Sequence, residues 1–89
     1  MVAEWGVYYT YVIESQADPA RRYLGHTSDL KARVAATNEG KCAHTRKFRP
    51  WKLRMYIAFE TLAQSQHFEA YLKTGSGHAF ANRHFWGCD

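Results

Sequence analysis

The sequence predicts an α/β protein of the α+β type, with a small three-stranded antiparallel sheet flanked by three helices in the order ββαβαα. Three stretches near residues 10, 24 and 56 are rich in β-forming residues, and two of them alternate with period two. Helix-length stretches begin at capping residues, and two of them end at glycines. A chain of 89 residues accommodates one domain with one modest core, which we expect to span residues 1–89.

The first two strands are predicted to form an antiparallel hairpin. Residues 7–14 alternate, and Tyr9 and Tyr11 fall on one face because side chains of a strand point to opposite faces in turn. Residues 15–20 contain Asp18-Pro19, which predicts a turn, and residues 21–27 return as the second strand. Gly25 inside that strand indicates a bulge or a close approach of another group to the backbone.

A helix is predicted to follow the hairpin. Thr27 or Ser28 is expected to cap it, with Asp29 in its first turn, where a carboxylate favours the helix dipole. Gly40 is expected as its C′ residue. Residues 41–51 show no periodicity and predict a basic loop that ends near Pro50.

The last third of the chain predicts one strand and two helices. The strand is expected to bury one face made of four alternating apolar residues, Leu53, Met55, Ile57 and Phe59. Thr61-x-x-Gln64 predicts a capping box for a helix that runs to about Thr74. Ser76 is expected to cap a shorter helix over residues 77–85.

The basic residues are unevenly distributed, and the net charge is +4. Six of the 12 lysines and arginines lie between Lys41 and Arg54, and no acidic residue occurs between Glu39 and Glu60. Such a segment favours contact with a polyanion. The alternative is a solvated loop that only keeps the protein soluble. The candidates for nucleic-acid binding are Lys41, Arg46, Lys47, Arg49 and Lys52.

Other features restrict the class of protein. No apolar run is long enough for a transmembrane helix, and the N-terminal residues do not form a signal peptide. Cys42 and Cys88 form no metal-ligand or redox pair, and we expect two reduced thiols in a cytoplasmic protein. The five histidines show no zinc-ligand spacing.

Four side chains are candidates for phosphodiester chemistry. Tyr11, Tyr23 and Arg33 lie in consecutive elements that can converge, and phenols with a guanidinium can bind a phosphodiester. Glu69 is the only acidic residue between Thr61 and Cys88. Each has an ordinary structural alternative: half-buried strand aromatics, an exposed helix arginine, and a Glu69–Lys73 pair at i, i+4.

These motifs, taken in order, resemble the GIY-YIG nuclease superfamily. Tyr9-Thr10-Tyr11 stands where GIY would stand, and Tyr23-Leu24-Gly25 stands where YIG would. Arg33 follows at the spacing of the family arginine. The resemblance covers about Val7 to His84 and is greatest to the short, single-domain branch. It continues through Asn38-x-Gly40, Pro50-Trp51-Lys52-Leu53, and Glu69 with Lys73 ahead of Gly75-Ser76-Gly77.

The resemblance implies a catalytic role for each candidate. Tyr23 would activate the attacking water, with Tyr11 as a second phenol, and Arg33 would bind the scissile phosphate. Glu69 would bind one divalent metal, Mg²⁺ or Mn²⁺, because a single carboxylate suits an ion that keeps several waters. The implied products carry 5′-phosphate and 3′-hydroxyl ends. His26 stands where some relatives carry lysine and could relay protons, since imidazole exchanges protons near neutrality; a surface histidine is the alternative.

Two residues depart from the family pattern and a third has no firm alignment. Thr37 stands where many relatives carry a histidine, directly before Asn38, and its absence can weaken activity. Tyr9 replaces the glycine of GIY. Asn82 lies at a plausible distance from Glu69 for an asparagine that some relatives use, although the alignment does not decide this.

The leading interpretation is a metal-dependent endonuclease that acts on DNA, in repair or processing. The alternative is a nucleic-acid-binding module of the same fold with weak or lost catalysis, and a third is a small structural protein. The presence of Tyr11, Tyr23, Arg33 and Glu69 together favours the enzyme. Substrate choice, DNA against RNA, oligomeric state and any protein partner that supplies specificity stay open.

Overall fold

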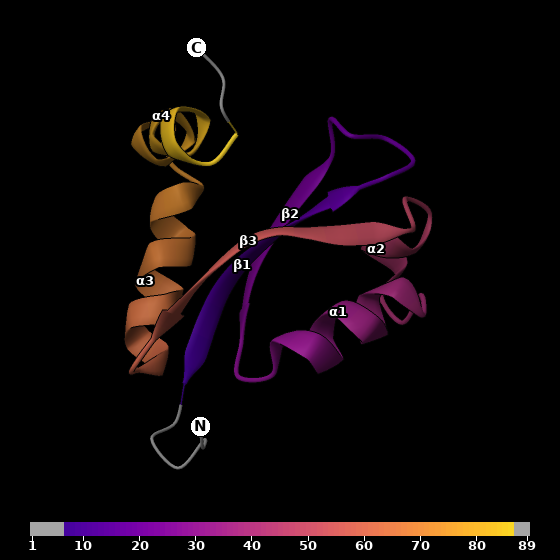
Figure 1. Ribbon diagram of the computed structural model, residues 1–89, viewed down its shortest axis with the longest axis horizontal. Coiled ribbons are helices and arrows are strands. Elements are labelled where there is room, and N and C mark those ends of the chain that lie inside the picture. The colour runs from indigo at the N-terminus through magenta and orange to yellow at the C-terminus, as the bar shows by residue number, and fades with distance from the viewer. Residues whose placement is uncertain (1–6, 87–89) are drawn as a thin grey trace.

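The structure is a computed structural model, and it describes residues 7–86. Within residues 7–86 the structure has three strands and four helices (Figure 1), so the predicted fold class is confirmed, and the predicted element order holds apart from one additional helix. The additional helix is a single turn within the stretch predicted as a basic loop. Within residues 7–86 no helix is long and apolar enough to cross a membrane. The elements are β1 Tyr8–Ser15, β2 Arg22–Thr27, α1 Leu30–Asn38, α2 Ala43–Arg46, β3 Trp51–Phe59, α3 Leu62–Leu72 and α4 Gly75–His84.

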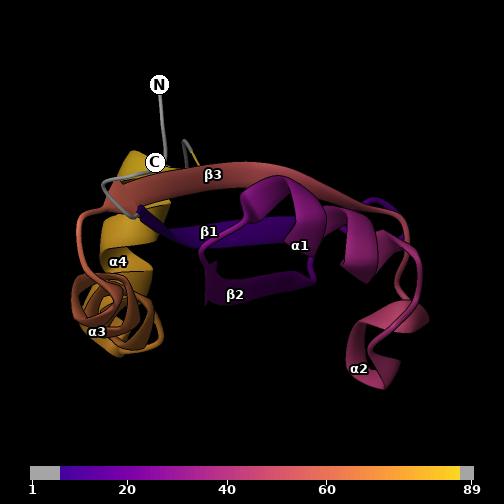
Figure 2. The same ribbon diagram turned by 90° about the horizontal axis from the view of Figure 1, so that it is seen from below.

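The sheet has the order β2-β1-β3, and both pairs of strands are antiparallel. β1 is therefore the central strand, and most of its residues are buried. Helices α1 and α2 lie on one side of the sheet, and α3 and α4 lie on the other, as Figures 1 and 2 show from two directions. β2 is an edge strand, and groups from both helical layers can reach it.

Each face of the sheet has its own packing. Tyr11 and Ile13 form a buried cluster with Trp51, against which α1 packs through Leu30 and Val34. Leu30 and Val34 thus form the apolar face of α1. The intervening residue Val12 faces the other layer and lines a cavity there with residues of α3 and α4. The alternation of β1 thus supplies both cores.

β3 departs from its predicted pattern because of a bulge opposite Val12 and Ile13. Leu53 pairs with Ile13, whereas Met55 pairs with Val12, so Arg54 is an extra residue between two ladder pairs. Directly paired residues share a face, and the expected stripe is therefore divided. Leu53 lies on the α1 side and is exposed, while Met55, Ile57 and Phe59 lie on the α3 side and are half-buried.

The helix caps were predicted correctly at one of three N-termini. The capping box between Thr61 and Gln64 is present. For α1 the cap is Asp29, which accepts from the backbone N–H of Ala32 at 3.1 Å, rather than Thr27 or Ser28. For α4 the cap is Thr74, not Ser76. Gly40 follows α1 with φ +83°, as expected of a C′ glycine.

Asn38 closes the segment that carries the basic residues. Its Nδ2 donates to the carbonyl of Trp51 at 2.9 Å, and its Oδ1 accepts from the N–H of Trp51 at 2.6 Å. The amide thus pairs with the backbone of Trp51 much as a neighbouring strand would. This clamp joins the end of α1 to the start of β3 and encloses most of the basic segment, residues 41–52.

Candidate active site

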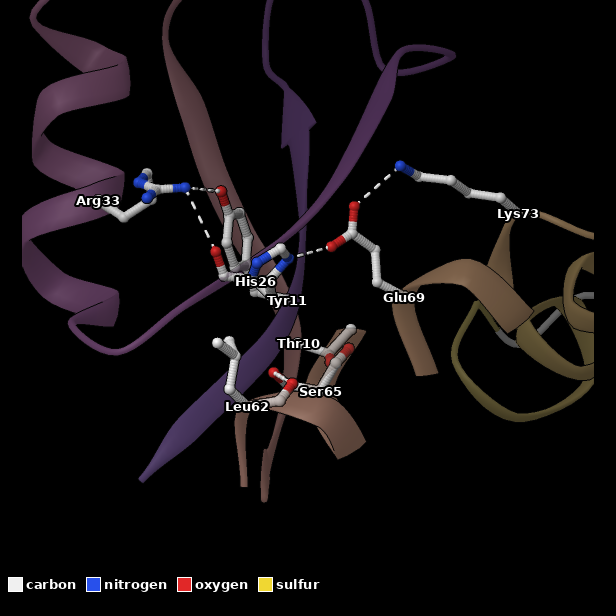
Figure 3. A network of polar contacts seen from close by, with 8 residues as sticks. All are labelled: Thr10, Tyr11, His26, Arg33, Leu62, Ser65, Glu69 and Lys73. Carbon is white, nitrogen blue, oxygen red and sulfur yellow. Dashed lines mark hydrogen bonds and ion pairs between the residues drawn. The ribbon is translucent and has the colours of Figure 1, made fainter. Parts of the chain in front are cut away.

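Arg33 is held by two neighbours at the centre of the candidate site (Figure 3). Its Nη1 donates to the hydroxyl of Tyr11 and to the backbone carbonyl of His26, both at 3.4 Å. Within residues 7–86 both of these contacts use the same nitrogen, so the other edge of the guanidinium keeps its donors for a ligand. The helical arginine is thereby joined to both strands of the hairpin.

A pocket of about 270 Å³ adjoins this arginine. Tyr11, Tyr23 and Arg33 all line it, so three of the predicted site residues share one concave surface. Tyr11 is 1% exposed and therefore belongs to the core, whereas Tyr23 is 45% exposed and presents part of its side chain to solvent. The remaining lining residues are Ala36, Thr37, Lys41, Cys42 and Thr45.

The pKa of the Tyr11 hydroxyl responds to its burial and to the charges of Arg33, Tyr23 and Glu69. Burial raises the pKa of Tyr11 above 10.0, although the hydrogen bond and charge of Arg33 oppose this. The charges of Tyr23 and Glu69 raise that pKa further, which indicates that both groups lie near the phenol. Tyr11 is therefore a neutral phenol at neutral pH, and its hydroxyl proton is free to donate because Arg33 supplies the other hydrogen bond.

Glu69 is reached through His26 rather than through the pocket. Nδ1 of His26 lies 2.5 Å from Oε1 of Glu69, and Nζ of Lys73 lies 2.8 Å from Oε2. Burial tends to raise the pKa of Glu69, but the hydrogen bonds from Lys73 and His26 outweigh it, and the pKa lies below 4.5. The carboxylate is ionised at neutral pH, so it accepts the hydrogen bond from Nδ1 of His26.

A buried hydrogen bond sets the position of Glu69. The hydroxyl of Thr10 in β1 donates to the carbonyl of Ser65 in α3 at 2.7 Å, and both residues are fully buried. Ser65 lies one turn before Glu69 on the same helix (Figure 3), so this bond fixes where α3 crosses the sheet. His26 pairs with Thr10 in the ladder and therefore faces α3.

Glu69 offers one carboxylate ligand, which suits a divalent cation that keeps most of its water molecules. The described residues around it do not form a complete set of metal ligands. In the described part of the chain, no group of three or more His, Cys, Asp or Glu side chains could hold a metal ion. One ionised carboxylate leaves most of a metal's coordination to water and to substrate oxygens, as Mg²⁺ prefers.

The basic residues do not all face the same way. Lys41 lines the pocket, and Arg46, Lys47 and Arg49 are exposed around α2. Lys52 is exposed on β3 and pairs in the ladder with Glu14, so it lies on the face of the sheet where Arg54 forms an ion pair with Glu14 beside Trp86. Lys41, Arg46, Lys47, Arg49 and Lys52 are thus exposed cations in a segment that also contains the buried Thr45 and Trp51.

Three further residues from the sequence analysis can be placed. Thr37 is buried in the wall of the pocket, where its hydroxyl donates to the carbonyl of Arg33 at 2.9 Å, so it is not a free base. Asn82 lines a cavity on the opposite side of the sheet and does not join the site. Cys42 is an exposed free thiol in the pocket wall, whereas Cys88 lies outside the described residues.

The sequence did not reveal how Thr10, Ser65 and Asn38 support the site. Thr10 and Ser65 are 55 positions apart, and no local pattern joins them. Their one available signal was that each is a small hydroxyl residue at a position that faces the sheet or helix interior. Asn38 was part of a family motif, but its clamp on Trp51 depends on the path of the whole basic segment.

Gly25 leaves the space that Tyr11 occupies. A Cβ at this position would lie 2.6 Å from the hydroxyl oxygen of Tyr11 and 2.8 Å from Cζ of its ring. Because the ring is buried, it has little room to move away. We expect Gly25→Ala to lower the free energy of unfolding by about 1–3 kcal/mol, measured by urea denaturation.

Gly75→Ala is the matched control, because a Cβ there would meet nothing within 4 Å. Tyr11→Phe removes the closest atom, and we expect the double variant Gly25→Ala/Tyr11→Phe to lose less stability than the sum of the single variants. Equal urea midpoints for Gly25→Ala and the wild type would show that Tyr11 is not confined as described.

Comparison with known proteins agrees with this geometry. A family model described as the GIY-YIG catalytic domain matches residues 7–82, which include both tyrosine motifs, Arg33 and Glu69. A search among curated proteins finds no match. The matched region contains all three strands and most of the helical residues of the fold. By this match the chain belongs to the GIY-YIG family, a family of nucleases.

Proposed function

We propose that this protein is a metal-dependent endonuclease that hydrolyses DNA phosphodiester bonds and leaves 5′-phosphate and 3′-hydroxyl ends. The observation that supports this most strongly is the position of Arg33. It is anchored through one nitrogen by Tyr11 and His26, and it shares a pocket with Tyr23 and Lys41. The free edge of its guanidinium can bind two phosphoryl oxygens as a fork.

The proposed chemistry assigns one task to each side chain. Arg33 binds the scissile phosphate and the charge that develops on its oxygens. Tyr11, as a neutral phenol, donates to the same phosphate, and the exposed hydroxyl of Tyr23 orients the attacking water. Nε2 of His26 can accept the proton that leaves this water, because its Nδ1 is held by Glu69.

Glu69 would hold the divalent metal, with Mg²⁺ or Mn²⁺ as the expected ion. When bound, such an ion supplies charge neutralisation at the phosphoryl and leaving oxygens. The short contact with His26 keeps the carboxylate directed towards β2, the edge strand that also carries Tyr23. Thr10 contributes indirectly, because it fixes the helix from which Glu69 projects.

The direct test is incubation of the purified protein with supercoiled plasmid, branched DNA and single strands, with and without Mg²⁺. We expect Mg²⁺-dependent cleavage of at least one of these DNAs and none in EDTA. Supercoiled plasmid reports single nicks, and the other two report a preference for DNA structure. Absence of cleavage in every sample, with binding retained, would favour a second function.

The second candidate function is a nucleic-acid-binding module with weak or lost catalysis. It is favoured by the pairing of both carboxylate oxygens of Glu69 and by Thr37, which is back-bonded within α1. Under either function we propose DNA as the main partner, a cytoplasmic location and a role in DNA repair or processing. A protein partner could supply specificity.

The exposed basic segment is expected to provide most of the sequence-independent affinity. Lysines and arginines that contact phosphates release counterions, so binding weakens as salt rises. We expect replacement of Arg46, Lys47 and Arg49 by Gln to reduce the slope of log K against log salt by about one unit for each lost contact. Fluorescence anisotropy of a labelled duplex, titrated at several salt concentrations, measures this slope.

Arg83→Gln is the control for this prediction, since Arg83 is exposed on α4, at the other end of the molecule from α2 (Figure 1). It should leave the slope nearly unchanged. If the triple variant also keeps the wild-type slope, the basic segment does not contact DNA phosphates and only helps to keep the protein soluble.

A further inference from the structure

We infer that Lys73 alternates between two partners: it neutralises Glu69 when no metal is bound, and it contacts a phosphate oxygen of the substrate during cleavage. This inference rests on the proposed function. In the structure both carboxylate oxygens of Glu69 are occupied, Oε1 by His26 and Oε2 by Lys73 (Figure 3). A divalent cation that binds Glu69 must therefore displace one of these partners or share an oxygen with it.

Lys73 is the partner that can move. Its side chain is 57% exposed, and it stands at the C-cap of α3, where the helix ends. Its four-carbon stem allows the ammonium to turn through several ångströms without any change in the backbone. His26 lies within β2, and its carbonyl is held by Arg33, so its ring is less free to leave.

Charge favours the exchange. The ion pair of Glu69 and Lys73 carries no net charge, and a dication placed on the same carboxylate repels the ammonium. The scissile phosphate that Arg33 is proposed to bind would bring a new anion to the site. Lys73 then joins Arg33 as a second cation on the substrate, but as a mobile point charge instead of a fixed fork.

If Lys73 exchanges Glu69 for the phosphate, its replacement should have opposite effects on metal binding and on catalysis. Lys73→Gln removes the group that competes with the metal, so we expect Mn²⁺ to bind about two- to fivefold more tightly. The same variant lacks the cation that would contact the phosphate. We expect its single-turnover cleavage at saturating Mn²⁺ to fall about ten- to hundredfold. Lys73→Arg keeps the charge and should retain most of the cleavage rate.

Both quantities can be measured on the full chain. Free Mn²⁺ is titrated by electron paramagnetic resonance without DNA, and cleavage is followed by quenched flow or manual quenching. Lys31→Gln, which neutralises another exposed helical lysine, is the matched control and should change neither quantity. Circular dichroism verifies that each variant is folded.

The outcomes separate this inference from the proposed function. If Lys73→Gln matches Lys31→Gln in Mn²⁺ affinity and in cleavage, Lys73 forms only a surface ion pair and the inference is wrong, while the function stands. If Glu69→Gln binds Mn²⁺ as the wild type does, Glu69 is not the metal ligand, and both proposals are overturned. Tighter Mn²⁺ binding together with slower cleavage supports the inference, because simple loss of structure would weaken both.

Discussion

Replacing Glu69 with Gln is expected to abolish DNA cleavage while the fold and the affinity for DNA stay intact. Gln has nearly the same shape, and its amide oxygen can still accept a hydrogen bond from His26, while the exposed Lys73 can turn to solvent, so the local packing should hold. It lacks the charge that a divalent metal needs. Because metal-assisted stabilisation of a transition state amounts to several kcal/mol, we expect the rate to fall at least about a thousandfold.

The measurement compares Mg²⁺-dependent plasmid nicking with DNA binding in EDTA. Glu60→Gln is the control, because Glu60 is an exposed carboxylate just before α3. The pKa of Glu69 lies below 4.5, so the carboxylate is ionised throughout the neutral range. Its charged contacts add stability that is present above its unfolded pKa and is lost as the pH falls through the lower folded pKa. Full cleavage by Glu69→Gln would contradict the metal assignment.

The second large effect is expected from Tyr23 and Arg33 acting on one phosphate. Both side chains line the same pocket, Tyr23 from β2 and Arg33 from α1. Tyr23→Phe removes one hydroxyl from a residue that is 45% exposed, so we expect little effect on the packing. Arg33→Lys keeps the charge but cannot hold Tyr11 and His26 while it also binds phosphate as a fork.

Each single variant should cleave about a hundredfold to a thousandfold more slowly, with DNA binding changed far less, since both groups act mainly in the transition state. Residues that act as a unit are not additive. We therefore expect Tyr23→Phe/Arg33→Lys to be scarcely slower than the slower single variant in single-turnover kinetics. Rate losses that multiply would indicate that the two groups act in separate steps.

Much of the fold could be predicted from the sequence because short local patterns determine where most strands and helices lie. Alternation defined the hairpin, and the capping box at Thr61 began α3 where expected. The caps of α1 and α4 were misplaced because several capping residues stand close together. Thr27 accepts from the N–H of Asp29 in a local turn, while Asp29 makes the cap itself. Choosing among them requires the path of the chain.

The bulge at Arg54 and the helix α2 depend on longer-range contacts. The buried Glu14 pairs with Arg54 across the sheet, an interaction that draws this residue out of the expected alternation. Thr45 in α2 is buried, and its carbonyl accepts from Nε1 of Trp51 at 2.8 Å. Neither contact has a signal in the local sequence, because each joins residues from different elements.

The candidate site divides in the same way. Tyr11, Tyr23 and Arg33 follow one another within a hairpin and the next helix, so their convergence was predictable from spacing. Glu69 comes from the other side of the sheet. Its link to Arg33 through His26 depends on how α3 docks on β1, and that docking rests on a buried hydrogen bond between distant residues.

The most direct test of the central claim is the chemistry of the cut ends. Plasmid nicked by the wild-type protein in Mg²⁺ is freed of protein and incubated with a DNA ligase that seals only 5′-phosphate and 3′-hydroxyl ends. We predict that the nicks are resealed, and that plasmid treated with the Glu69 variant was never nicked. Nicks that the ligase cannot seal, or equal nicking by the Glu69 variant, would contradict hydrolysis at this site.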